Sequence, residues 1–162
     1  MNWFWLSGMV VAVDQVTKYI ADNNLDLRVP EEVFTGLNMT LCYNKGAAFS
    51  FLSNAGGWQR WLFMCISFII SIVIIHCLRN VDPKRVSLSW GLSLILGGAI
   101  GNLIDRSLYG YVIDFIDVYY EHWHYPAFNV ADTAISIGAG LLIIDIFTNN
   151  EPCFKKPHET KN

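Results

Sequence analysis

The sequence predicts an all-α integral membrane protein with four transmembrane helices and a small β-structure outside the membrane. Its 162 residues are 53% hydrophobic and 15% charged, with a mean hydropathy of +0.34, whereas soluble domains contain about 25% charged residues. A helix needs about 20 largely apolar residues to cross a bilayer. Four segments meet this need, at about Trp3–Ile20, Trp58–Leu78, Val86–Ile104 and Phe128–Phe147. We expect one domain, 1–162, and four such long apolar runs disfavour a soluble helical bundle.

The first segment is expected to remain in the protein as a span. It lacks the basic residues that begin a secretory signal peptide, and it runs into "DQVTK" instead of a small-residue cleavage site. Tryptophan and tyrosine lie at or near the ends of the segments, among them Trp58, Trp90 and Tyr125. Aromatic side chains prefer these positions because they sit well at the membrane–water interface.

The distribution of Lys and Arg predicts that both termini lie in the cytoplasm, where basic residues are enriched. The connection between the second and third spans and the tail (149–162) contain most of the loop cations: Arg79, Lys84, Arg85, Lys155, Lys156 and Lys161. The loops at about 21–57 and 106–127 are then extracytoplasmic. In the first of them, "VFTGLNMTLCYNKGAAFSFL" mixes β-branched and aromatic residues with partial alternation, which predicts short strands of a small sheet.

This topology brings several polar side chains to the depth of the outer membrane interface. They come from the ends of the first and third spans, the second outer loop and the start of the fourth span: Asp14, Lys18, Asn102, Asp105, Arg106, Asp114, Asn129 and Asp132. Ionisable residues at membrane depth are costly and therefore mark candidate functional sites.

Some of these charges also have a structural interpretation. Asp14 and Lys18 are four residues apart, so they share a helix face and are expected to pair. Asp105 and Arg106 are interpreted as a helix-end ion pair with the loop. These four residues therefore serve either the site or the stability of the helices.

The remaining carboxylates differ in how readily structure explains them. Asp117, three residues after Asp114, is interpreted as a solvated loop charge, and Asp145 as a group that snorkels or pairs near the inner end of the fourth span. Asp132 lies one turn into an apolar helix, where Asn129 is placed to cap the helix N-terminus. Asp132 is thus the acid that is hardest to assign to structure alone.

Two carboxylates on different elements that meet in a partly dry site would form an aspartyl dyad. Close together they share one proton, because both cannot ionise at once. The ionised acid activates water for attack on a peptide carbonyl, while the protonated one polarises that carbonyl. A small transporter or proton channel lined by carboxylates is the main alternative, and a membrane scaffold with ion pairs is a third. The clustering of charges at one end of the spans favours the protease.

Other classes of site have less support. "EHWH" (121–124) lacks the spacing of a zinc site and is interpreted as interfacial histidines. We expect no metal, no organic cofactor and no disulfide among the four cysteines. Gly97 and Gly101 form a G-x-x-x-G pattern, which predicts close helix packing. The net charge of -3 gives no support for binding to nucleic acid, which requires a basic face.

Ordered sequence blocks resemble the family of lipoprotein signal peptidase, or signal peptidase II, a bacterial aspartyl protease of the inner membrane. The blocks are "DQVTK" (14–18), "NKGAAFSFL" (44–52), "GGAIGNLIDRSLYGYVIDFIDV" (97–118) and "FNVADTAI" (128–135). The resemblance implies that Asp114 and Asp132 are catalytic. It also implies that substrate is bound by Asn44, Gly46, Asn102, Arg106 and Asn129, with Asp14 in support.

The same resemblance implies the fold and the reaction. The fold would be four transmembrane helices with a small extracytoplasmic β-cradle and a short outer half-helix. The substrate would be a diacylglyceryl-modified prolipoprotein, cut just before its lipidated cysteine near the outer, periplasmic leaflet. Membrane lipids would be further partners, and cyclic peptide antibiotics that mimic the lipobox, such as globomycin, would inhibit the enzyme.

Overall fold

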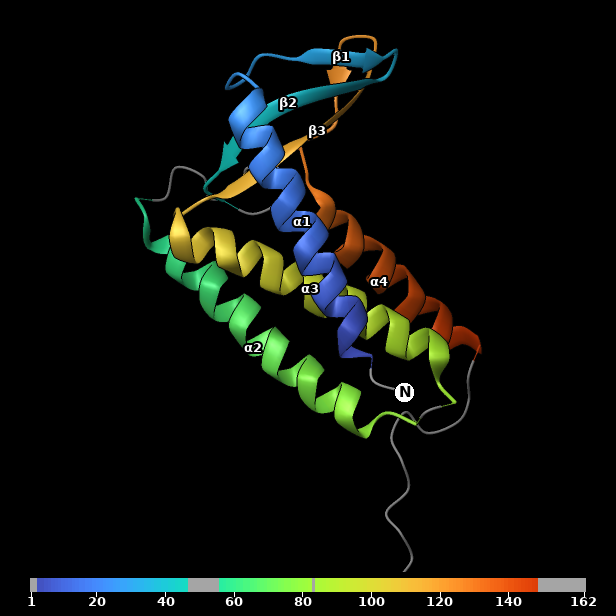
Figure 1. Cartoon of the computed structure of the whole chain (residues 1–162). Coiled ribbons are helices and arrows are strands. Elements are labelled where there is room, and N and C mark those ends of the chain that lie inside the picture. The colour runs from blue at the N-terminus through green and yellow to red at the C-terminus, as the bar shows by residue number, and fades with distance from the viewer. Residues whose placement is uncertain (1–2, 47–55, 83, 149–162) are drawn as a thin grey trace, which may run out of the picture.

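The computed structural model, which describes residues 3–46, 56–82 and 84–148, is a bundle of helices with a sheet at one end (Figure 1). The helices are α1 (Phe4–Asn24), α2 (Trp58–Asn80), α3 (Val86–Leu108) and α4 (Val130–Thr148). All four predicted helices are therefore present. By length and composition, α2, α3 and α4 are apolar and long enough to cross a membrane. The chain is thus a mostly helical membrane protein.

Helix α3 lies at the centre of the bundle and packs against each of the other three helices. Gly97 allows the close approach of α1, since a Cβ at this position would lie 2.6 Å from the Cβ of Val10. At Gly101 a Cβ would lie 2.5 Å from Oδ2 of Asp14. The predicted packing role of the G-x-x-x-G pattern is confirmed, and it brings α1 against the polar end of α3.

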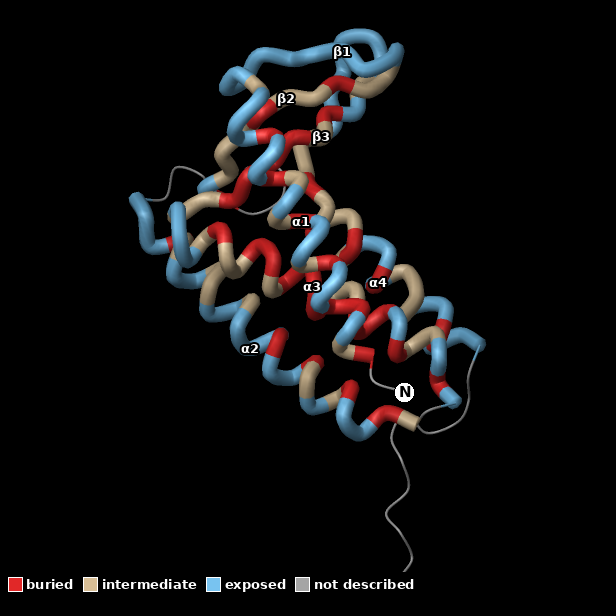
Figure 2. Tube along the Cα trace, viewed as in Figure 1, coloured by how far each residue is buried: buried red, intermediate tan, exposed pale blue. Residues whose placement is uncertain are grey.

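Apolar side chains cover much of the bundle's outer surface, as expected for contact with lipid. Helix α2 is exposed along most of its length (Figure 2), including Phe68, Ile69 and Val73. A small core cluster near the opposite end from the sheet contains Trp3, Ile74, Leu78, Leu92 and Leu96. The bundle is therefore held partly by this core and partly by buried polar contacts between helices.

The sheet is antiparallel with strand order β1-β2-β3-β4. Its strands are β1 (Glu31–Phe34), β2 (Leu37–Asn44), β3 (Val112–Tyr120) and β4 (Trp123–His124). The predicted strands of the first outer loop are confirmed. Strands β3 and β4 were expected to be loop. The sequence of β3 does not show the alternation of polar and apolar residues that predicts a strand, because Val112 to Phe115 are all buried.

Strand β3 contains a bulge that changes which side chains share a face. The N–H groups of Phe115 and Ile116 both donate to the carbonyl of Phe128, at 3.1 and 2.9 Å, so two residues oppose one. Across the sheet, Asp114 pairs with Cys42 and Asp117 pairs with Asn38. The pairing of β2 with β3 shifts by one residue between Met39 and Cys42, but Thr40 and Cys42 line one cavity together with Asp117, so these three side chains point to one side of the sheet.

Asp114 and Asp117 therefore lie on the same face of the sheet, although they are an odd number of residues apart. The expected outer half-helix is not present among the described residues. Part of the "NKGAAFSFL" block (47–52) and the whole tail (149–162) lie outside them.

Candidate active site

Asp114 and Asp132 come from different elements and meet through one shared side chain. Asp114 is on β3 and is 2% exposed, while Asp132 is in the first turn of α4. Asn129 donates its side-chain Nδ2 to Oδ1 of Asp114 at 2.7 Å, and its Oδ1 accepts the backbone N–H of Asp132 at 2.9 Å. Asn129 caps α4, as predicted, and it also ties the helix to the first carboxylate.

Two further asparagines donate to the two carboxylates. Asn102 Nδ2 is 2.8 Å from Oδ1 of Asp132, and Asn44 Nδ2 is 3.0 Å from Oδ2 of Asp114. Each acid thus accepts at least one amide hydrogen bond, which stabilises a carboxylate without neutralising it.

Gly46 and Arg106, two further residues of the predicted site, are hydrogen-bonded to the same group through Asn44. The N–H of Gly46 donates to Oδ1 of Asn44 at 2.9 Å, and Nη2 of Arg106 donates to the carbonyl of Gly46 at 3.2 Å. The structure therefore brings all the predicted site residues of the outer end into one connected group.

Behind the two acids lies a buried ionic group that connects α1, α3, β3 and α4. Lys18 Nζ is 2.8 Å from Oδ2 of Asp14 and 2.8 Å from Oδ2 of Asp105. Asp14 accepts the N–H of Ala131 at 2.9 Å, and Asp105 accepts the N–H of Ile113 at 3.2 Å. All three charged side chains are at most 2% exposed.

Ala131 and Ile113, whose N–H groups donate to Asp14 and Asp105, directly precede Asp132 and Asp114. One lysine thus anchors the backbone next to both acids. Lys18 also donates to Oδ1 of Asn102 at 3.0 Å, so its charge lies close to the site.

The predicted pairing of Asp14 with Lys18 is confirmed, but the interpretation of Asp105 is wrong. Asp105 does not form a pair with its neighbour Arg106; it points inward to Lys18 and Ile113. Sequence reasoning also missed the linking role of Lys18. Its one available signal was a lysine four residues after an aspartate within an apolar span, and this spacing does not reveal contacts from other helices.

The environment of Asp114 favours its protonated form. Burial raises the pKa of Asp114 to about 7, and the negative charge of Asp132 acts in the same direction. Hydrogen bonds from Asn44 and Asn129 and the charge of Lys18 lower it, but by less. An acid poised near neutral pH is suited to general acid–base catalysis.

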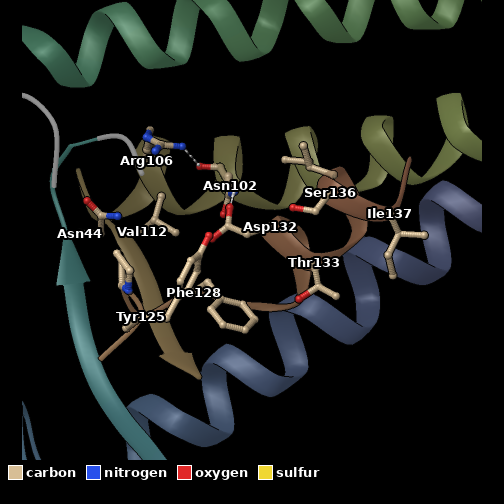
Figure 3. Close-up of a pocket in the computed structure, with 13 residues that line it drawn as sticks. Asn44, Asn102, Arg106, Val112, Tyr125, Phe128, Asp132, Thr133, Ser136 and Ile137 are labelled. Carbon is tan, nitrogen blue, oxygen red and sulfur yellow. Dashed lines mark hydrogen bonds between the residues drawn. The ribbon is translucent and has the colours of Figure 1, made fainter. Parts of the chain in front are cut away.

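A cavity of about 460 Å³ opens beside this group. Figure 3 shows Asn44, Asn102, Arg106 and Asp132 gathered at one end of it, while Thr133, Ser136 and Ile137 continue along α4. Val112, Phe128 and Ile135 add apolar walls. Asp114 does not line the cavity itself, and the amide of Asn44, which does line it, is bonded to Asp114. The cavity therefore joins a polar end with a long apolar side.

The second acid of the loop, Asp117, was expected to be solvated, and this is wrong. It is 6% exposed and accepts hydrogen bonds from Thr40 at 3.1 Å and Asn38 at 3.4 Å. His124 Nδ1 lies 2.9 Å from its Oδ1. The bulge in β3 and the pairing with β4 bury a carboxylate that sequence position alone places in a loop.

The inner end of the bundle contains a second buried ionic contact. Asp145 of α4 pairs with Arg85, and both side chains are at most 5% exposed. The predicted pairing of Asp145 near the inner end is confirmed. Between the two ends, the segments 61–75, 86–101 and 133–144 contain no Asp, Glu, Lys or Arg. The charges thus do not form a path through the depth of the spans.

Comparison with known families and proteins gives one consistent result. Residues 6–148 match the family model described as signal peptidase (SPase) II. The chain is 51% identical over 145 residues to the lipoprotein signal peptidase of Acinetobacter baumannii, which covers 90% of this chain and 82% of the relative. It is 42% identical over 159 residues to that of Actinobacillus succinogenes, covering 98% and 96%.

Solved structures agree with these relationships. One, described as a bacterial membrane enzyme, superposes with a TM-score of 0.81 at 34% sequence identity and covers 95% of this chain and 94% of the other. A second structure with the same description gives a TM-score of 0.77 at 34% identity.

Proposed function

The chain belongs to the signal peptidase II family of aspartic peptidases, which remove signal peptides from prolipoproteins, and on this premise we propose that Asp114 and Asp132 are its catalytic dyad. The observation that supports this assignment is the contact of Asn129 with both residues, at 2.7 and 2.9 Å. One side chain holds two acids from separate elements, Asp132 at the polar end of the cavity and Asp114 behind Asn44, which lines it.

In this mechanism the two acids share one proton. The ionised carboxylate takes a proton from a water molecule as that water attacks the scissile carbonyl, and the protonated acid polarises the carbonyl oxygen. The proton then passes to the leaving amine. Asn44, Asn102 and Asn129 hold the carboxylates in place, and no metal or organic cofactor takes part.

The proposed substrate is a prolipoprotein whose cysteine already contains diacylglycerol, and the cut falls just before that cysteine. The cavity suits such a substrate because its polar end adjoins the dyad and its apolar walls continue along α4. Burial of acyl chains contributes about 0.8 kcal/mol per CH₂. Arg106 and Gly46, which are hydrogen-bonded to each other, are proposed to orient the peptide, with Asp14 in support.

We further propose the placement of the enzyme in the bacterial inner membrane. Helix α1 is the fourth span, both termini are cytoplasmic, and the sheet lies at the outer, periplasmic surface as the β-cradle. The whole chain, 1–162, then forms one peptidase domain. Cyclic peptides that mimic the lipobox, such as globomycin, would inhibit it by filling the cavity.

The test is cleavage of a lipidated precursor by purified protein in detergent. Asp114→Asn and Asp132→Asn should each abolish cleavage while leaving the protein folded and inserted. Cleavage at a near-normal rate by either variant would remove that residue from the mechanism. Equal cleavage of an unlipidated precursor would contradict the role of the diacylglycerol.

A further inference from the structure

A second cavity, of about 390 Å³, lies on the sheet next to the proposed active site. Thr40, Cys42, Asp117 and His124 line it, together with the segment 125–127. That segment also lines the first cavity. One short piece of chain is therefore the common wall of the two cavities, and a bound peptide that passes along it contacts both.

The second cavity lies on the same face of β3 as the dyad. Asp114 and Asp117 lie on one side of the sheet, next to their cross-strand partners Cys42 and Asn38 of β2. At about 3.3 Å per residue, Asp117 lies within about 10 Å of Asp114 along the strand. An extended peptide on this face covers that length in about three residues.

The direction of strand β3 indicates which part of the substrate, before or after the cleaved bond, reaches the second cavity. Strand β3 leads away from the helices towards the far edge of the sheet (Figure 1), so Asp117 lies farther from the membrane than Asp114. A signal peptide contains an apolar segment of about 7–15 residues, so in the proposed reaction the signal segment lies in the membrane among the helices. The part of the substrate that reaches Asp117 is then the mature chain after the cysteine.

The charge of this region favours a cationic partner. Among the described residues 22–46 and 109–127 there are seven carboxylates and two cations, Arg28 and Lys45. Inside the cavity the acid is Asp117, which is held by Thr40 and by His124. The side chain of His124 is 50% exposed, so the cavity is open to solvent beside the carboxylate of Asp117.

We propose that the second cavity is a subsite for a basic side chain, lysine or arginine, at the second to fourth residue of the mature lipoprotein. This inference rests on the proposed function, because it takes the substrate's direction from the dyad. Asp117 acts as a specificity residue: it binds substrate and takes no part in the bond cleavage.

The experiment compares lipidated precursors that differ only by Lys or Glu at the second, third or fourth mature position. Cleavage by the full-length enzyme is measured in a zwitterionic detergent, which excludes attraction of lysine to anionic lipid. We expect kcat/KM to favour Lys over Glu about tenfold at one of these positions, the ratio produced by one charge-assisted hydrogen bond. A ratio within twofold at all three, or a preference for Glu, would overturn the subsite.

Matched variants assign the preference to this cavity. Asp117→Asn should bring the Lys/Glu ratio close to one, and His124→Lys should do the same by placing a fixed positive charge beside the carboxylate. His124→Gln, which is neutral, should keep the ratio. Glu121→Gln removes one exposed charge on the turn between β3 and β4 and should also keep it.

The outcomes separate the subsite from the proposed function. If the wild-type enzyme cleaves none of the lipidated precursors, the proposed function fails. If it cleaves all of them equally, only the subsite fails. Should Asp117→Asn not fold, the two substitutions of exposed His124 still decide the question: equal ratios in His124→Lys and His124→Gln would overturn the assignment.

Discussion

The two ends of the helix bundle both bury charge, but in different proportions. At the inner end, one arginine, Arg85, meets one carboxylate, Asp145. At the outer end, four carboxylates lie around two cations: Asp14, Asp105, Asp114 and Asp132 with Lys18 and Arg106. A matched pair stabilises a junction between helices. At the outer end, burial and the charge of Asp132 raise the pKa of Asp114 to about 7, which is what the proposed chemistry requires.

The largest effect is expected from Lys18→Met. Removing the cation leaves Asp14 and Asp105 buried without their partner, and breaking such a contact costs about 3–5 kcal/mol. Because the same lysine anchors the backbone beside both acids of the proposed dyad, cleavage should fall at least about a hundredfold. Thermal unfolding in detergent and cleavage of a lipidated precursor measure the two effects. Normal cleavage in a folded variant would show that Lys18 does not position the dyad.

The inner pair provides the contrast. Arg85→Met alone should lower the free energy of unfolding by about 3–5 kcal/mol, since it leaves Asp145 buried without its cation. The double variant Arg85→Met with Asp145→Leu should recover most of that loss, because apolar replacements remove both charges. In the folded double variant kcat should stay within a few-fold of the wild type. A large loss of kcat would mean that the inner end also serves the chemistry.

A smaller effect is expected at Gly101, where α3 passes Asp14. In Gly101→Ala the new Cβ would lie 2.5 Å from Oδ2 of Asp14, so the helices must separate or the carboxylate must move. Such overpacking costs about 1–3 kcal/mol, and we expect cleavage to fall about tenfold. Gly140→Ala is the matched control, because nothing lies within 4 Å of its Cβ. Equal activity of the two variants would contradict the tight fit at Gly101.

The smallest effect on kcat/KM is expected from a change of pH. The pKa of Asp114 is raised to about 7, so this acid keeps its proton up to neutral pH and loses it above. With both carboxylates ionised, no acid is left to protonate the leaving amine. We therefore expect kcat/KM to decline above pH about 7, approaching tenfold per pH unit. A rate that stays constant from pH 7 to 9 would contradict a shared proton with this pKa.

An element can be predicted from the sequence when neighbouring residues determine it, and not when contacts with distant residues do. Helix α2 contains a long apolar run with a tryptophan at its start, so local composition suffices to identify it. Strand β3 has no such local signal, because its first four residues, Val112 to Phe115, are all buried. Its bulge depends on the carbonyl of Phe128, which lies a dozen residues later. The sequence-based expectation of a loop was therefore wrong.

The same distinction applies to the acids. By itself the sequence determined the four helices and the family blocks, and it proposed Asp114 and Asp132 as the dyad, because hydropathy and motifs are properties of neighbouring residues. Only the tertiary structure decided that Lys18 reaches Asp105, that Asp117 is buried with His124, and that two cavities share one wall. The physical reason is that the cost of burying a charge depends on partners brought from distant parts of the chain.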